Sequence, residues 1–316
     1  MKYFELNSGQ SIPAVGLGTW KAEGEAARTA VSSALRTGYR HIDCAWLYGN
    51  EKQVGQGIAD VLAEGVVPRE RLFVTSKLWN SFFRPQDVER GLEDSLTKLG
   101  LEYVDLYLLH WPMPLRPGTG VPQSPEDFVR LTELPLERTW DALIKLKERG
   151  LVRAIGVSNF GPRRLKALIA STGFAPAVNQ VELHPYNPWP ELLDTCAECG
   201  VHATAYAPLG SLDRPAFMKQ PDEPHLLDHP VVEETAANLG VTPAQLLIAW
   251  AIARGTSAIP KSTHPGRIAE NLAAADLTLP ATALAALSGI PQRFRFVNPT
   301  PMFIQGVNYE GDSFWD

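Results

Sequence analysis

The run Leu72-Phe73-Val74-Thr75-Ser76-Lys77 is short and apolar, which is typical of a buried strand. A helix is predicted next, over residues 85–99, because Pro85 suits a first helical turn and Gly100 suits a helix end. The following run, Tyr103-Val104-Asp105-Leu106-Tyr107-Leu108-Leu109-His110, predicts a second buried strand. A strand, a helix and a strand in this order predict two parallel strands joined by a right-handed crossover.

The same alternation extends in both directions along the chain. Further helices are predicted over residues 136–150 and 162–170. Further strands are predicted at residues 14–17, around Ile42, at 154–158, 177–180 and 202–206, and around Ile259. Eight strands separated mostly by helices predict a (β/α)8 barrel, although a doubly wound sheet also fits the alternation alone. Because no linker divides the chain, we expect one domain over residues 1–316.

Three irregular features surround this predicted barrel. Residues 3–6 and 11–13 flank the turn Asn7-Ser8-Gly9-Gln10, which predicts a small β-hairpin outside the barrel. Long connections are expected at residues 112–135 and 208–229, and the tail after Pro291 has no regular pattern. Long loops on a barrel usually shape a binding site, so we expect substrate loops here.

Composition excludes several classes of function. The 29 Lys and Arg residues against 35 Asp and Glu residues give a net charge of −6, so we expect neither nucleic-acid nor membrane binding. No apolar run approaches the roughly 20 residues of a membrane helix, and the first residues lack the apolar core of a signal peptide. With only three cysteines in the chain, we expect a cytoplasmic protein.

Polar residues close most of the predicted strands. The chemistry of a (β/α)8 barrel lies at the carboxyl ends of its strands, so these side chains should meet on one rim. The strand-end residues are Asp43, Lys77, His110, Ser158, Asn159, Gln180, Tyr206, Lys261 and Ser262. These nine residues belong to seven strand ends. One polar strand end is ordinary, but seven polar strand ends that converge on one rim indicate a site.

Four residues near this rim can form one acid–base unit. A free tyrosine has a pKa of about 10, and a nearby ammonium group lowers it. Lys77 can supply that charge to Tyr48, Asp43 can hold Lys77 in place, and His110 can orient a carbonyl group. The alternative is a buried ion pair, a rim tyrosine and a histidine at the edge of the core.

At these residues the sequence resembles the aldo-keto reductase family. The segment Gly38-Tyr39-Arg40-His41-Ile42-Asp43-Cys44-Ala45 with Tyr48-Gly49-Asn50-Glu51 is similar to the first family signature. Ile259-Pro260-Lys261-Ser262, followed by Arg267, Glu270 and Asn271, is similar to the cofactor signature. The resemblance implies a (β/α)8 barrel that binds NADPH without a Rossmann fold, with NADH as a weaker alternative. It also implies that Tyr48 is the proton donor.

The resemblance further implies a set of cofactor contacts. Ser158, Asn159 and Gln180 would hold the nicotinamide carboxamide, and Tyr206 would stack on its ring. The remaining cofactor residues that it implies are Thr19, Trp20 and Lys21; Leu209, Ser211, Leu212 and Asp213; and Lys261, Ser262, Arg267, Glu270 and Asn271. In this set Lys21 and Asp213 resemble the clasp across the cofactor, and Lys261, Ser262 and Arg267 would meet the adenosine 2′-phosphate. Guanidinium and ammonium groups bind phosphate strongly, which favours NADPH.

The resemblance places the substrate among aromatic side chains. Trp20, Trp79 and Trp111 would line an apolar slot beside Tyr48 and His110. We also expect Trp46 and Phe82-Phe83 to make the mouth of this slot aromatic. The tail, residues 294–316, is the part that the family uses to select substrates.

The sequence therefore predicts a reductase of aldehydes, with aldoses among the candidates, that acts on a small carbonyl substrate as a monomer. A second hypothesis is a redox-sensing, nucleotide-binding subunit that acts through a protein partner. A hydrolase with paired carboxylates has little support, because Glu182 has no evident matching acid. Cys196 and Cys199 lie in a predicted helix without a second pair, so we interpret them as structural.

Overall fold

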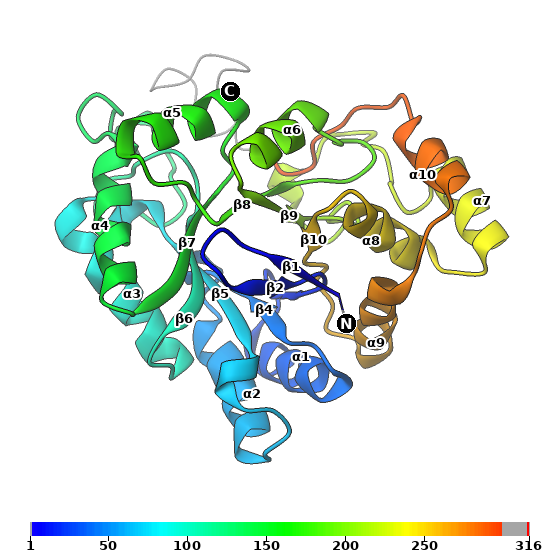
Figure 1. The fold of residues 1–316 in the computed structure, drawn as a ribbon, viewed down its shortest axis with the longest axis horizontal. Helices are drawn as coiled ribbons and strands as arrows, with labels where there is room; N and C mark the ends of the chain where they lie inside the picture. Colours follow the sequence, from blue (N-terminus) through cyan, green and yellow to red (C-terminus); the bar gives the residue numbers. More distant parts are fainter. Residues whose placement is uncertain (1, 299–314, 316) are drawn as a thin grey trace.

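The chain forms a closed barrel of parallel strands (Figure 1). The computed structural model describes residues 2–298 and Trp315. The barrel strands are β3 (Leu17–Gly18), β4 (His41–Asp43), β5 (Phe73–Leu78), β6 (Val104–Leu109), β7 (Val152–Ser158), β8 (Val178–Glu182), β9 (His202–Tyr206) and β10 (Ser257–Ala258). Each strand pairs in parallel with the next along the chain, and bridges from Val15 to Ala258 and from Gly18 to Lys261 close the ring. The predicted (β/α)8 barrel is confirmed.

Helices surround the barrel and alternate with its strands (Figure 1). They are α1 (Gly24–Thr37), α2 (Glu51–Ala63), α3 (Pro85–Leu99), α4 (Leu136–Glu148), α5 (Pro162–Thr172), α6 (Pro190–Glu198), α7 (Pro230–Leu239), α8 (Pro243–Ala253), α9 (Pro265–Ala273) and α10 (Ala281–Ser288). The predicted helix at residues 85–99 has the expected ends, since Gly100 adopts a φ of 65° and its N–H donates to the carbonyls of Leu96 and Thr97. The additional helices α7 and α10 pack against each other.

Nearly all residues of the barrel strands are buried, which explains their continuous apolar runs. Every residue of β5 and β6 is buried. Polar side chains that point into the barrel pair with one another, as His41 does with Thr75 and Thr204 with Ser257. The barrel therefore has a filled interior.

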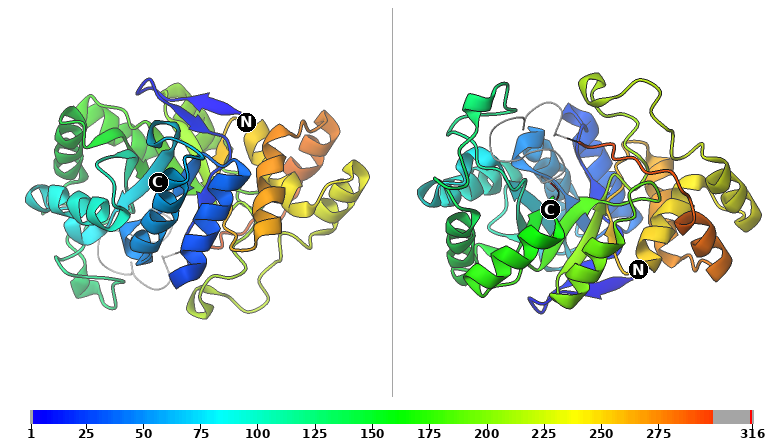
Figure 2. Two further views of the ribbon diagram at one scale, coloured as in Figure 1. Left: turned by 90° about the horizontal axis from the view of Figure 1, so that it is seen from below. Right: turned by 90° about the horizontal axis from the view of Figure 1, so that it is seen from above.

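The predicted hairpin closes one end of the barrel. Strands β1 (Tyr3–Glu5) and β2 (Ser11–Pro13) pair in antiparallel register, and Asn7 in their turn donates to the carbonyls of Pro176 and Gly200. Those carbonyls precede β8 and β9, so the hairpin covers the amino-terminal ends of the strands. Figure 2 shows the hairpin in dark blue and the loop of residues 208–229 in yellow-green at opposite ends of the barrel.

Short 3₁₀ turns occur in the connections, at residues 46–48, 69–71, 80–82, 125–127, 216–218 and 274–276. The predicted tail begins as an irregular segment, and residues 299–314 and 316 of it lie outside the described residues. Within the described part of the chain no single helix is long and apolar enough to cross a membrane; α7 and α8 taken together, bent by 91°, pass on length and composition alone. The single-domain assignment for residues 1–316 stays a prediction.

We predict that Gly55→Ala destabilises the fold. Helix α2 approaches the end of α3 so closely that a Cβ atom at Gly55 would overlap the carbonyl oxygen of Leu99. Overpacking of this kind should lower the free energy of unfolding by about 2 kcal/mol, measured by urea denaturation. Gly120→Ala is the control because that glycine has open space around it. Equal stability of the two variants would contradict the close packing of α2 on α3.

Candidate active site

The carboxyl ends of the strands bring most of the predicted residues to one cleft with a volume of about 1010 Å³. Asp43, Ser158 and Tyr206 end β4, β7 and β9, and His110 directly follows β6. The predicted residues that line the cleft are Thr19, Trp20, Asp43, Tyr48, Trp79, His110, Trp111, Ser158, Asn159, Gln180, Tyr206, Leu209, Ser211, Leu212, Asp213, Lys261, Ser262, Arg267, Glu270 and Asn271. Lys77 and Lys21 are not part of that lining, but both contact residues of it.

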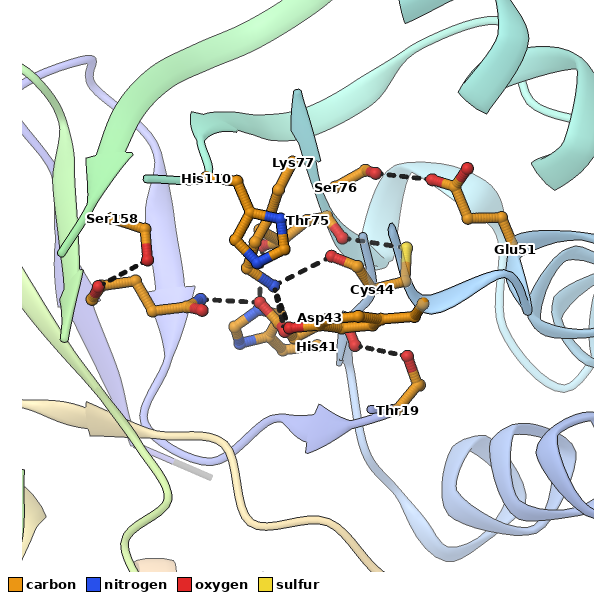
Figure 3. A network of polar contacts seen from close by, with 12 residues as sticks. Thr19, His41, Asp43, Cys44, Glu51, Thr75, Ser76, Lys77, His110 and Ser158 are labelled. Carbon is orange, nitrogen blue, oxygen red and sulfur yellow. Dashed lines mark hydrogen bonds and ion pairs between the residues drawn. The ribbon is translucent and has the colours of Figure 1, made fainter. Parts of the chain in front are cut away.

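A buried ion pair lies at the floor of the cleft. The Lys77 Nζ atom is 2.6 Å from the Asp43 Oδ1 atom, and both side chains are 2% exposed or less. The same Nζ atom donates to the Cys44 carbonyl at 3.0 Å and to the Tyr48 hydroxyl at 3.3 Å. The other oxygen of Asp43 accepts from the Gln180 amide at 2.7 Å. Figure 3 shows the Lys77 side chain reaching between Asp43 and Cys44.

Burial acts against both charges of this pair, and each partner offsets part of that effect. For Lys77 burial is the largest effect and lowers the pKa, but Asp43, Tyr48 and Cys44 together outweigh it, so the net pKa of Lys77 is raised. For Asp43 burial raises the pKa, and Lys77 and Gln180 act in the opposite direction. Lys77 is therefore held as an ammonium directly beside the Tyr48 hydroxyl.

Tyr48 differs from the expectation drawn from the sequence. Burial raises the pKa of Tyr48 to about 12, while Lys77 acts to lower it. The expected effect of Lys77 is thus present but smaller than the effect of burial. Tyr48 lies in the 3₁₀ turn of residues 46–48, which the left-handed Gly49 ends. At neutral pH the hydroxyl is protonated and has a proton to give.

His110 is an uncharged imidazole in this setting. Burial, with Lys77 nearby, holds the pKa of His110 well below its ordinary value. Its ring packs edge-on against Tyr48 at 5.7 Å and against Trp79 at 5.3 Å between centroids. Its Nδ1 atom is buried without a hydrogen-bond partner among the described residues. A neutral imidazole carries one N–H, which suits the hydrogen-bond donor predicted for this position.

The predicted carboxamide residues form a network of their own. The Ser158 hydroxyl and the Asn159 backbone N–H both donate to the Gln180 carbonyl, at 2.8 and 3.0 Å. The Asn159 side chain donates to the His110 carbonyl at 3.0 Å and accepts from the Tyr206 hydroxyl at 2.8 Å. Asn159 adopts a φ of 66°, a left-handed conformation that asparagine tolerates. These contacts fix the amide groups beside the ion pair.

The end of the cleft that is predicted to hold the adenosine carries the predicted cations. The Lys261 ammonium is 2.8 Å from the Asp213 carboxylate, and Lys21 donates to the Asp213 carbonyl, so both predicted clasp residues meet. Ser262 and Arg267 lie at the start of α9, where His264 accepts from the Arg267 N–H. The Glu270 carboxylate accepts from the Thr242 hydroxyl at 2.6 Å, which fixes it against α8.

Two expectations about the mouth of the cleft need correction. Neither Trp46 nor Phe82 nor Phe83 belongs to the cleft lining. Trp46 instead donates to Asp94 of α3 and packs edge-on against Phe82, 5.1 Å between centroids, because helix α3 passes directly beside the turn.

Several residues of the long loops also line the cleft, and none of them was predicted from the sequence. Met113, Val121 and Pro122 line the cleft from one loop, and Phe217 and Met218 line it from the other. Their loops were predictable from length, but no periodicity indicated which loop residues would face inward.

Glu182, the acid of the hydrolase alternative, lies in an environment that does not suit that role. It is fully buried, pairs with His184 at 2.8 Å and accepts from the backbone N–H groups of Phe296 and Val297. Cys196 is buried on α6 and Cys199 lies one turn further along. In the part of the chain that the structure describes, no group of three His, Cys, Asp or Glu side chains could hold a metal ion.

We predict that Lys77→Met strongly destabilises the protein. The change leaves Asp43 buried without its cation, which should lower the free energy of unfolding by about 3 kcal/mol. Because Lys77 acts to lower the pKa of Asp43, its removal lets burial raise that pKa further, so the loss should grow as the pH rises and favours ionised Asp43. Urea denaturation at pH 5 and pH 8 tests this. The double variant Lys77→Met/Asp43→Asn should recover much of the loss, and an equal loss in both variants would contradict the pairing.

Comparison with known proteins agrees with this arrangement. The sequence model of the Aldo/keto reductase family matches residues 14–291. The chain is 46% identical to "Aldo/keto reductase slr0942" of Synechocystis sp. over 316 residues, which is 100% of this chain and 97% of that protein. It is 43% identical to "Aldo-keto reductase family 1 member A1" of Mus musculus and of Homo sapiens, over 93% of this chain and 90% of each relative. The chain therefore belongs to the aldo/keto reductase family and is an NAD(P)H-dependent oxidoreductase that acts on small carbonyl compounds.

Proposed function

We propose that the protein reduces aldehydes to primary alcohols with NADPH, with aldoses among the candidate substrates. The observation that carries this proposal is the buried Asp43–Lys77 pair at the floor of the cleft, with its ammonium 3.3 Å from the Tyr48 hydroxyl. NADPH, when bound, supplies the hydride for the carbonyl carbon. The chain itself has to bind the substrate, orient its carbonyl and deliver one proton to the oxygen.

Tyr48 is the proposed proton donor. Its raised pKa, about 12 in the absence of ligands, means that it holds a proton throughout the neutral range. As the hydroxyl gives up this proton, a phenolate forms beside the Lys77 ammonium, which stabilises it. Asp43 fixes the Lys77 side chain at the required position and keeps it charged. His110 donates a hydrogen bond to the developing oxyanion from its neutral ring.

The residues of the cleft fit a nicotinamide dinucleotide. Ser158, Asn159 and Gln180 offer amide and hydroxyl groups beside the ion pair, where a carboxamide would lie. At the other end Lys261 and Arg267 offer cations at the start of α9, where backbone N–H groups also favour an anion. We assign these two cations and Ser262 to the adenosine 2′-phosphate, which gives a preference for NADPH over NADH.

The substrate pocket is apolar. Trp20, Trp79 and Trp111 line it together with loop residues such as Met113 and Val121. A carbonyl group enters with its oxygen toward Tyr48 and His110 while the rest of the substrate contacts the aromatic side chains. The cytoplasmic location and the monomeric state stay predictions.

The sensing-subunit hypothesis is less well supported. A protein that only binds the nucleotide needs the adenosine and carboxamide contacts but has no need of a proton donor. Here Asp43, Lys77 and Tyr48 are all in contact, and the cleft continues past the carboxamide residues into the tryptophan-lined pocket. A proton donor held in place and a tryptophan-lined pocket for a substrate both favour an enzyme that turns over.

Tyr48→Phe should remove turnover and keep cofactor binding. The change deletes the proton donor but retains the ring, so the rate of aldehyde reduction should fall by about 10²- to 10⁴-fold. NADPH oxidation, followed by absorbance against a panel of aldehydes, aldoses and ketones, measures the rate, and quenching of protein fluorescence measures binding. Tyr3→Phe on the hairpin is the control. Wild-type turnover by Tyr48→Phe would exclude Tyr48 as the acid.

Arg267→Ala should weaken NADPH binding selectively. Loss of a charge-assisted contact to phosphate should raise the dissociation constant for NADPH by about tenfold or more and leave that for NADH unchanged. Fluorescence titration with each cofactor gives both constants, and Arg36→Ala, in a surface ion pair with Glu64, serves as the control. An equal effect on both cofactors would place Arg267 away from the 2′-phosphate.

A further inference from the structure

Arg214 is a buried arginine in a loop most of whose residues are exposed or partly exposed. We use the name clasp loop for residues 208–229, which carry Asp213 across the cleft to Lys261. The Arg214 side chain is 0% exposed, and its partner Glu223 is 8% exposed. Asp213 and Pro215 both line the cleft, but Arg214 between them does not. Its side chain therefore points away from the cleft and into the loop.

The guanidinium of Arg214 ties distant parts of the clasp loop together. Its Nη1 atom donates to the Ser211 carbonyl at 3.2 Å, and its Nε atom donates to the Met218 carbonyl at 3.3 Å. Its Nη2 atom pairs with the Glu223 carboxylate, which also accepts from the Gln220 backbone N–H. One side chain thus fixes the loop from Ser211 to Glu223 with charge-assisted hydrogen bonds.

The backbone of the clasp loop needs such support. Ser211 and Asp222 adopt φ values of 48° and 56°, and Ala207 just before the loop adopts 47°. Residues other than glycine seldom occupy this left-handed region, and they do so where the surrounding structure holds them there. Arg214 binds the Ser211 carbonyl directly. Asp222 directly precedes Glu223, the carboxylate partner of Arg214.

Arg214 also contacts the C-terminal segment, a name we use for residues 291–298. Its guanidinium lies over the Phe296 ring, 5.0 Å from the centroid. At the root of the loop, a Cβ atom on Gly210 would lie 3.2 Å from the same ring. The backbone of Phe296 is in turn fixed by the buried Glu182 carboxylate at the end of β8. The next residue, Val297, lines the cleft.

We propose that Arg214 is a positioning residue that links the clasp over the cofactor to the C-terminal segment beside the substrate pocket. Arg214 holds the loop so that Asp213 reaches Lys21 and Lys261, and it packs this loop on Phe296. Retention of the cofactor then depends on a residue that does not line the cleft. The inference rests on the proposed function, because it concerns the site assigned there to NADPH.

The test is the rate of NADPH release. A preformed complex is mixed in a stopped-flow instrument with excess NADP⁺, and the loss of NADPH fluorescence is followed. Arg214→Met, which keeps an unbranched apolar side chain but removes the charge and the donors, should release NADPH about tenfold faster, equivalent to about 1.4 kcal/mol. Glu223→Gln should change the rate in the same direction. Arg36→Met, in the exposed pair with Glu64, is the matched control and should release at the wild-type rate.

A double-mutant cycle separates positioning from general destabilisation. If Arg214 acts through Asp213, then Arg214→Met should have a much smaller effect on release in the Asp213→Asn background. A fully additive effect, or wild-type release by folded Arg214→Met, would overturn the proposal. If Arg214→Met does not fold, the release of NADPH is measured for Glu223→Gln instead, alone and in the Asp213→Asn background, and the same outcomes apply. Failure of the wild-type protein to bind NADPH would overturn the proposed function itself, whereas tight binding with unchanged release overturns only the role of Arg214.

Discussion

The ion pair between Asp43 and Lys77 is the interaction on which the rest of the site depends. Two opposite charges with almost no exposure are tolerated only because each compensates the other and because Gln180 and the Cys44 carbonyl satisfy the remaining hydrogen bonds. The barrel makes this possible, since Asp43 ends β4 and Lys77 lies near the end of the neighbouring β5. The ammonium is then fixed beside Tyr48, at the floor of the cleft.

In this barrel, the parts that stabilise the fold and the parts that form the site lie in different places. The hairpin closes the amino-terminal end, and the buried strands and surrounding helices supply the core. The opposite end carries the ion pair, the amide network and the cations at the start of α9. Above them the clasp loop and the C-terminal segment are joined through Arg214, Phe296 and Glu182. The clasp loop, which reaches across the cleft, therefore contacts a segment that also lines the cleft.

Much of this arrangement could be predicted from the sequence, and the reasons are physical. Continuous apolar runs closed by polar residues indicated both the parallel strands and the rim where Asp43, Lys77 and His110 meet. The pKa of Tyr48 could not be predicted, because its direction depends on how far burial outweighs the charge of Lys77. The orientation of Trp46 toward Asp94 and the packing of Arg214 on Phe296 could not be predicted from the sequence either. They depend on contacts between segments far apart in the chain, with no periodic signal.

The claim that this protein is a carbonyl reductase is tested most directly by following the hydride from NADPH to the product. NADPH carrying deuterium at the transferable position of the nicotinamide ring is incubated with the protein and a simple aldehyde, and the alcohol is analysed by mass spectrometry. A carbonyl reductase with this site should place the deuterium on the carbinol carbon of the product. Tight binding of NADPH with no labelled alcohol from any aldehyde or ketone would contradict the account and favour the sensing subunit.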